Sequence, residues 1–242
     1  MKDDSLKNKI AGLLAKAERT DNEHERDAFN AKAEALMLKY GIEQAELQAA
    51  GKIKPDEIIE VRLEFVGIYA IIMPAFAWRI SNALGGINVL KSKSYDGKTY
   101  YAYIIGHKSD VESMQILLAS LQLQAQSAMK RWWKTSELRS ILSNMDAYKA
   151  RRQFIASFAI GAADRIRSER RTEEATVSTG AALVLVSRQE KVDKWMHEQH
   201  NVVKSRGGAD GSAFGGAAGR AAGRQANVGT TGVSGGRKAL NG

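Results

Sequence analysis

The first fifty residues follow the period of an α-helix, with apolar side chains recurring every three or four positions. The segment Thr20-Asp21-Asn22-Glu23 has the form of a capping box, which predicts the start of a second helix. Gly41 can adopt the left-handed conformation that ends this helix, and a short third helix is predicted over 42–49. We therefore expect an N-terminal three-helix module over residues 1–51.

The pattern then changes to that of a small sheet. Residues 58–66 alternate between apolar and polar positions, which predicts a half-buried strand. The runs 87–95 and 99–105 flank Asp96-Gly97, which is a strong signal for a hairpin. Between them, Pro74 opens a helix that extends to Leu84. These features predict a three-stranded antiparallel sheet with a helix across one face.

Two long helices follow the sheet. The first begins at a second predicted capping box, Ser109-Asp110-Val111-Glu112, and extends to about Trp133. The second carries apolar residues from Phe154 to Ile166. The run 181–186 is either a strand or the start of a buried helix, and 187–199 has a helical pattern. The chain is thus predicted to be α+β and mostly helical, with residues 52–206 forming the main domain.

From Gly207 onward the chain is rich in glycine and alanine, with scattered arginines. Such a segment cannot bury enough apolar surface to offset the entropy lost on ordering. We therefore predict a mobile Gly/Ala/Arg-rich tail over residues 207–242. One or two helical turns around 217–226 can still form, above all against a partner.

Composition and charge narrow the classes of function. The chain has 242 residues, no cysteine and a formal net charge of +9. Without cysteine it cannot form disulfides, use a thiolate in catalysis or hold an iron–sulfur cluster. It has no apolar run of the roughly 20 residues needed to span a bilayer, and its first residues are polar. We expect a cytoplasmic protein with no membrane contact and an acidic partner, such as nucleic acid or an acidic protein.

The histidines do not form a recognisable catalytic or metal site. His197 and His200 are three residues apart, whereas a zinc-protease helix places its histidines four apart, and no third ligand is evident. We predict no metal and no cofactor. His107 and Asp110 lie between a strand and a helix, where sites often occur, so a hydrolase centred on them is one hypothesis. One histidine and one aspartate make no triad, however, and we expect a protein that is not an enzyme.

The strongest chemical signal is a run of basic and aromatic residues after residue 129. Residues 130–171 hold eleven lysines and arginines against four acidic residues. This pattern suits phosphate contact with base stacking, and it equally suits an interface with a protein. A third interpretation is purely structural: the tryptophans cover the core, and the arginines lie on the solvent-exposed surface of a helix. The candidate partner- or nucleic-acid-binding residues are Lys130, Arg131, Trp132, Trp133, Lys134, Arg139, Arg151 and Arg152.

A resemblance adds context to these patterns. The segments Lys16-Ala17-Glu18, Asn22-Glu23-His24-Glu25 and 31–42 (AKAEALMLKYGI) resemble the N-terminal module of a phage-encoded family of unknown function. The likeness continues more loosely through 106–112, 179–185 and 219–224. Members of this broad family resemble the recombination directionality factors of phages that use large serine integrases.

The resemblance implies a function that spacing and composition do not show. A directionality factor binds the integrase and switches it from integration to excision without being a recombinase itself. The expected function is therefore a phage recombination accessory protein whose partners are a serine integrase and DNA. The alternative is a non-enzymatic phage protein that binds nucleic acid and has no integrase partner.

Overall fold

The computed structural model describes residues 56–175, 179–202, 214–226 and 228, together with eleven positions between Lys9 and Leu36. The chain divides into two compact units, one formed by residues 1–38 and 227–242 and the other by residues 39–226. The second unit holds the strands and helices named below.

The first unit is described only in part. Ten of its eleven described positions before residue 37 are helical, and Thr20 is not. The hydroxyl of Thr20 donates a hydrogen bond to the carboxylate of Glu25, 2.9 Å away. Glu23, the predicted capping partner, and the predicted third helix over 42–49 lie outside the described residues. The three-helix module therefore stays a prediction.

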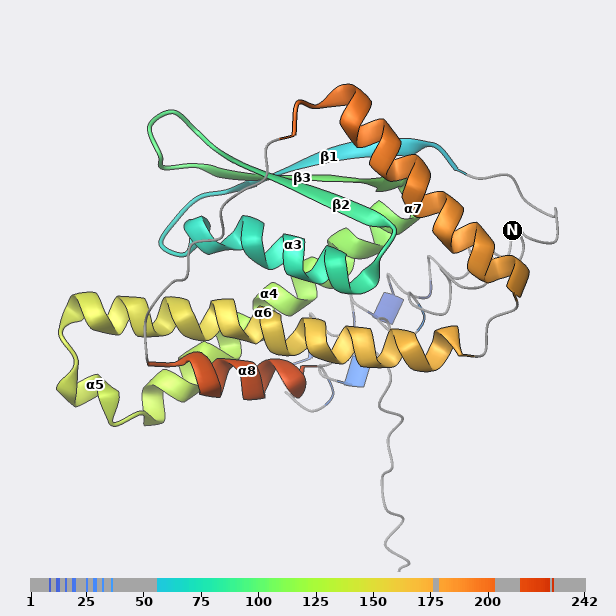
Figure 1. Ribbon diagram of the computed structural model, residues 1–242. Helices are drawn as coiled ribbons and strands as arrows, with labels where there is room; N and C mark the ends of the chain where they lie inside the picture. The colour runs from blue at the N-terminus through green and yellow to red at the C-terminus, as the bar shows by residue number, and fades with distance from the viewer. Residues whose placement is uncertain are drawn as a thin grey trace, which may run out of the picture. The chain divides into compact units, whose positions relative to one another are not determined.

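The second unit contains the predicted sheet. Strands β1 (Ile58–Phe65), β2 (Ile87–Lys93) and β3 (Tyr100–His107) pair antiparallel in the order β1-β3-β2 (Figure 1). The turn between β2 and β3 uses Gly97 at φ +68°, a conformation that favours glycine. The predicted sheet and its hairpin are confirmed.

One face of the sheet packs on helix α3 (Met73–Leu84), which follows a short 3-10 turn, η1 (Ala70–Ile72). The central strand sends Ala102 and Ile104 to this face, and α3 presents Phe76 and Ile80; all four are buried. Pro74 lies in the first turn of α3, where its missing N–H has no helical partner to lose.

Three further helices extend this core. They are α4 (Lys108–Thr135), the short α5 (Leu138–Ile141) and α6 (Asn144–Glu174). Leu118 and Leu121 of α4 and Phe154 and Phe158 of α6 are buried, and Phe158 stacks on Phe76 of α3 with ring centroids 6.5 Å apart. The protein is thus α+β and mostly helical, as its sequence predicts.

Helix α7 (Thr179–Gln199) crosses the opposite face of the sheet (Figure 1). The run 181–186 is therefore the start of a helix and not a strand. Hydrogen bonds hold α7 to β2 and to the turn before it, including a 3.5 Å bond from Gln189 Nε2 to Asn88 Oδ1. The Gly86 amide donates to Gln189 Oε1 (2.7 Å), and Asn88 donates to Asp193 Oδ1 (2.7 Å). Within the described residues, no helix is long and apolar enough to cross a membrane.

The prediction of a mobile tail from Gly207 is wrong for residues 214–226. Helix α8 (Gly216–Arg224) lies along α6 (Figure 1). Its glycines Gly219 and Gly223 are buried so close to α6 that an added Cβ would lie 2.1 Å from the carbonyl oxygens of Phe154 and Phe158. Such backbone contact needs no large apolar side chains, so composition allowed helical turns around 217–226 but did not predict that they dock on α6.

Candidate nucleic-acid interface

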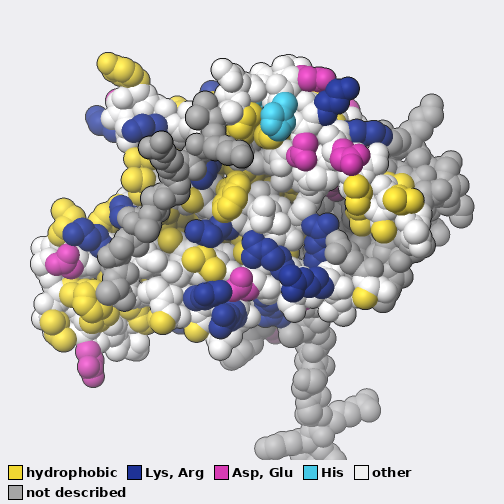
Figure 2. Space-filling view, in the orientation of Figure 1, with side chains coloured by type: hydrophobic (Ala, Val, Ile, Leu, Met, Phe, Trp, Pro, Cys, Tyr) yellow, Lys and Arg dark blue, Asp and Glu magenta, His cyan; other side chains and the backbone are white. Residues whose placement is uncertain are grey.

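A row of basic and polar side chains crosses four elements on one face of the second unit. It begins at β2, where the Lys91 ammonium lies 5.4 Å from the centre of the Trp78 ring. Asn82 follows Trp78 by one turn on α3 and accepts a hydrogen bond from Arg167 Nη2 of α6, 3.3 Å away. Figure 2 shows lysine and arginine side chains gathering over the middle of this face.

At the α8 end, three arginines surround a single carboxylate. Asp164 of α6 lies 3.5 Å from Arg167, 2.7 Å from Arg220 and 3.9 Å from Arg224. The guanidinium-bearing side chains are 40–60% exposed. We call the following set the arginine strip: Lys91, Trp78, Asn82, Arg167, Asp164, Arg220 and Arg224.

The arginine strip holds four cations and one carboxylate, so positive charge is in excess. Guanidinium groups bind phosphate and carboxylate through paired N–H donors, and exposed ones can exchange a carboxylate partner for a phosphate. The sequence did not reveal this site because its residues come from positions 78 to 224. Arg220 and Arg224 join it only because α8 docks on α6.

The predicted binding residues lie elsewhere, where α4, α5 and the start of α6 meet. Trp132 stacks on Phe154 with centroids 5.0 Å apart, and Trp133 lies 5.7 Å from Trp132. The Arg151 guanidinium lies 5.3 Å from the Trp133 ring. The structure thus brings Trp132, Trp133 and Arg151 together, half-buried, so the tryptophans partly cap the core.

The other predicted residues are not part of that stack. Arg152 lies over Tyr148 at 5.6 Å. The remaining four are exposed on α4 and α5: Lys130, Arg131, Lys134 and Arg139.

Large apolar side chains are exposed beside this basic region. Ile141 of α5 and Met145 at the start of α6 are 71% and 62% exposed, and we call this pair the apolar corner. Val66 and Ile68, in the loop after β1, are 70% and 63% exposed. The hydroxyl of Tyr148 donates to the Ile68 carbonyl (3.0 Å), which ties the loop after β1 to α6. Exposed apolar groups next to cations are a common feature of protein interfaces.

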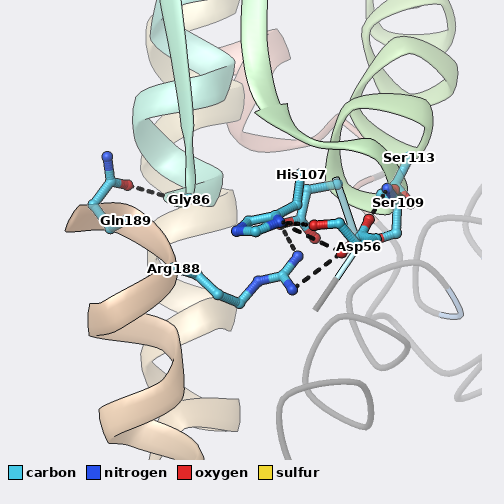
Figure 3. Close-up of polar contacts among 8 residues, drawn as sticks. Asp56, Gly86, His107, Ser109, Ser113, Arg188 and Gln189 are labelled. Atoms are coloured by element: carbon cyan, nitrogen blue, oxygen red, sulfur yellow. Dashed lines mark hydrogen bonds and ion pairs between the residues drawn. The ribbon is translucent and has the colours of Figure 1, made fainter. Parts of the chain in front are cut away.

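A third feature is a partly buried ionic cluster, shown in Figure 3, whose carboxylates Asp56 and Asp110 are 31% and 24% exposed. Arg188 of α7 reaches across to two carboxylates. Its Nη1 lies 3.3 Å from Asp56 Oδ1, and its Nη2 lies 2.7 Å from Asp110 Oδ2. The Arg188 side chain is only 7% exposed. Three elements therefore meet at one charge: the segment before β1, the start of α4, and α7.

His107 and Asp56 complete the cluster. His107 is 2% exposed, and its Nδ1 lies 2.7 Å from the Asp56 carbonyl oxygen. Its Nε2 is buried and has no hydrogen-bond partner among the described residues. The Asp56 carboxylate accepts a 2.7 Å hydrogen bond from the Ser109 amide, so the start of α4 is capped by a residue more than fifty positions away. The capping box predicted at Ser109–Glu112 is wrong, because α4 begins at Lys108, so that His107 and not Ser109 is the N-cap residue, and the His107 side chain makes no capping hydrogen bond.

The pKa values of Asp110 and Asp56 are shifted in opposite directions from the ordinary value of an aspartate. Burial raises the pKa of Asp110, and this effect outweighs the Arg188 charge that favours the carboxylate. Burial also acts to raise the pKa of Asp56. There, however, the hydrogen bonds from Ser109 and the charges of Arg188 and His107 prevail, so the Asp56 pKa lies below its ordinary value.

This arrangement has the geometry of a structural lock, because one arginine joins two carboxylates from separate parts of the chain. Asp110 pairs with Arg188, and no hydrogen bond joins it to His107 within the described residues. His197 and His200 also have separate partners, the Asp193 carbonyl and the Glu60 carboxylate. In the part of the chain that the structure describes, no three histidine or acidic side chains are placed to share a metal ion.

Comparison with known proteins identifies one short match. Residues 5–44 match the family DUF2786, whose description is "Protein of unknown function". No curated protein sequence and no solved structure matches the chain.

Proposed function

We propose that this protein is a non-enzymatic, cytoplasmic nucleic-acid-binding protein that contacts phosphates through the arginine strip. The observation that carries the proposal is the grouping of Arg167, Arg220 and Arg224 around the one carboxylate of Asp164 on an exposed face. The overall charge of +9 adds a long-range attraction to any polyanion.

The strip should make binding strongly dependent on salt. Each phosphate that a lysine or arginine neutralises releases condensed counterions. A plot of the logarithm of the affinity for duplex DNA against the logarithm of the salt concentration therefore has a slope of about −0.9 per phosphate contact. Phosphate contacts of this kind fix position and carry no sequence information. We therefore expect weak sequence preference.

Replacing Arg220 and Arg224 together by glutamine should weaken DNA binding and reduce the magnitude of the salt slope by about two. Fluorescence anisotropy with a labelled mixed-sequence duplex, repeated over a series of KCl concentrations, measures both quantities. The matched control is Lys134→Gln with Arg139→Gln, which removes the same charge at the α4–α5 end and should change the slope less. Circular dichroism checks that each variant folds. Equal effects of the two pairs would contradict the assignment to the strip.

The second candidate is the recombination directionality factor that the resemblance implies. The observation that favours it is the apolar corner, whose exposed side chains lie beside a basic region as in many protein interfaces. Such a factor would bind a large serine integrase on DNA and favour the excision arrangement. It can shift that equilibrium only by its difference in affinity for the two states.

Replacing Ile141 and Met145 by serine should abolish co-elution with a large serine integrase encoded in the same genome. The same variant should no longer promote excision in a reconstituted recombination assay. Both side chains are more than 60% exposed, so the core is spared. The control is Leu183→Ser with Val186→Ser, two exposed apolar residues of α7 that should leave integrase binding unchanged. If the unaltered protein neither binds the integrase nor changes the direction of recombination, this candidate is wrong.

A further inference from the structure

Trp78 is a large aromatic side chain that the core does not use. The buried residues of α3 include Phe76, Ala77, Ile80 and Ala83, whereas Trp78 is 41% exposed. Within the described residues no other aromatic ring stacks on it, and the Lys91 ammonium lies over its ring. An indole placed in this way resembles the stacking surfaces of proteins that bind single strands.

The residues around Trp78 in the arginine strip indicate which class of ligand it suits. Lys91 lies over its ring, and Asn82, one turn further along α3, contacts Arg167. Helix α6 lies between α3 and α8, so the axes of α3 and α8 are separated by two interaxial distances, or about 16–20 Å. At about 3.4 Å per nucleotide along a stacked strand, that distance corresponds to about five or six nucleotides.

We infer that the arginine strip binds a single-stranded nucleic acid, with one base stacked on Trp78 and the flanking phosphates on Lys91 and the arginines. This inference rests on the proposed nucleic-acid binding. It specifies that the nucleic acid is single-stranded. In a duplex each base face is covered by the neighbouring bases, so stacking on a tryptophan would add no affinity unless those bases were first unstacked. In a single strand the base faces are accessible, and stacking adds to the phosphate contacts.

The test compares one oligonucleotide as a single strand and annealed to its complement, with the full-length protein. Trp78→Ala should weaken single-strand binding about tenfold, because it removes the aromatic ring on which a base would stack. Duplex binding should change less than about twofold, since the phosphate contacts remain. The control is Tyr95→Ala, a fully exposed aromatic residue outside the strip, which should affect neither.

Trp78→Phe keeps a stacking surface and separates stacking from folding. It should retain most of the single-strand affinity while losing part of the tryptophan fluorescence quenching that the single strand causes in the unaltered protein. An equal loss for both forms of DNA, or no loss, in Trp78→Ala would overturn the inference. The proposed function would still stand if the Arg220 and Arg224 variant lost binding. Failure of the unaltered protein to bind either form would refute both.

Discussion

Replacing Arg188 by methionine should destabilise the protein by up to about 3–5 kcal/mol, the cost of removing one partner from a fully buried ion pair. This cost is an upper limit because Asp56 and Asp110 are 31% and 24% exposed. Methionine keeps most of the apolar stem, so the main loss is the charge. Asp56 and Asp110 would then lie close together beneath α7 with no guanidinium between them. Unfolding in urea, followed by circular dichroism, measures the change.

The pH dependence of this loss identifies its cause. Arg188 favours the ionised form of both Asp56 and Asp110, so its removal should raise the pKa of each carboxyl group in the folded protein. The penalty belongs to the carboxylates and should shrink as they become protonated. We therefore expect the difference in stability between Arg188→Met and the unaltered protein to be larger at pH 7 than near pH 4.

The matched control lies on the same helix. Lys194 pairs with Glu198 at 3.8 Å but is 78% exposed, and exposed pairs contribute little. Lys194→Met should change stability by less than about 0.5 kcal/mol. A change below about 1 kcal/mol for Arg188→Met would mean that the cluster does not lock α7 to the segment before β1 and to the start of α4.

Replacing Gly219 by alanine should detach α8 from α6. The new Cβ would lie 2.1 Å from the backbone oxygen of Phe154, and a helix backbone cannot yield as a flexible side chain does. We expect a loss of about 2–3 kcal/mol, at the upper end for overpacking. Limited proteolysis should then cut within residues 214–226 faster than in the unaltered protein.

Gly216 offers the control for this change. It lies in the same helix, but an added Cβ there would meet its nearest neighbour, Ser157 Oγ, at an ordinary 3.6 Å. Gly216→Ala should leave stability unchanged or raise it by up to about 1 kcal/mol, because alanine is the better helix former. If Gly219→Ala behaves like Gly216→Ala, the close packing of α8 on α6 is wrong. Gly219→Ala should also weaken nucleic-acid binding, because Arg220 and Arg224 would leave the strip.

Helices and strands whose signals lie among near neighbours could be predicted from the amino-acid pattern alone. The alternation over 58–66 became β1, Asp96-Gly97 became the hairpin turn, and Pro74 marks the first turn of α3. In each case the signal and the structure it specifies lie within a few residues of each other. The two long helices were equally readable, because a repeat of three and four residues needs no partner to be recognised.

The candidate sites depended on the tertiary structure. The sequence placed Trp132, Trp133 and Arg151 in one basic region, and α4 and α6 do bring them together. It gave no means of pairing Asp56 with Arg188, which is 132 positions away, or of capping α4 from outside the helix. Such contacts depend on how β1, α4 and α7 are arranged in space, which local propensity does not encode.

Helix α8 illustrates the same division most clearly. Glycines at 215, 219 and 223 recur every four residues, and that spacing is visible in the sequence. In an isolated chain it predicts disorder, because glycine favours the unfolded state and has no side chain to bury. Beside Gly161 and the carbonyl groups of α6, the same spacing lets two backbones approach closely. The local sequence determined where glycines stand, and only the packed surface of α6 decided that they form a docked helix and complete the arginine strip.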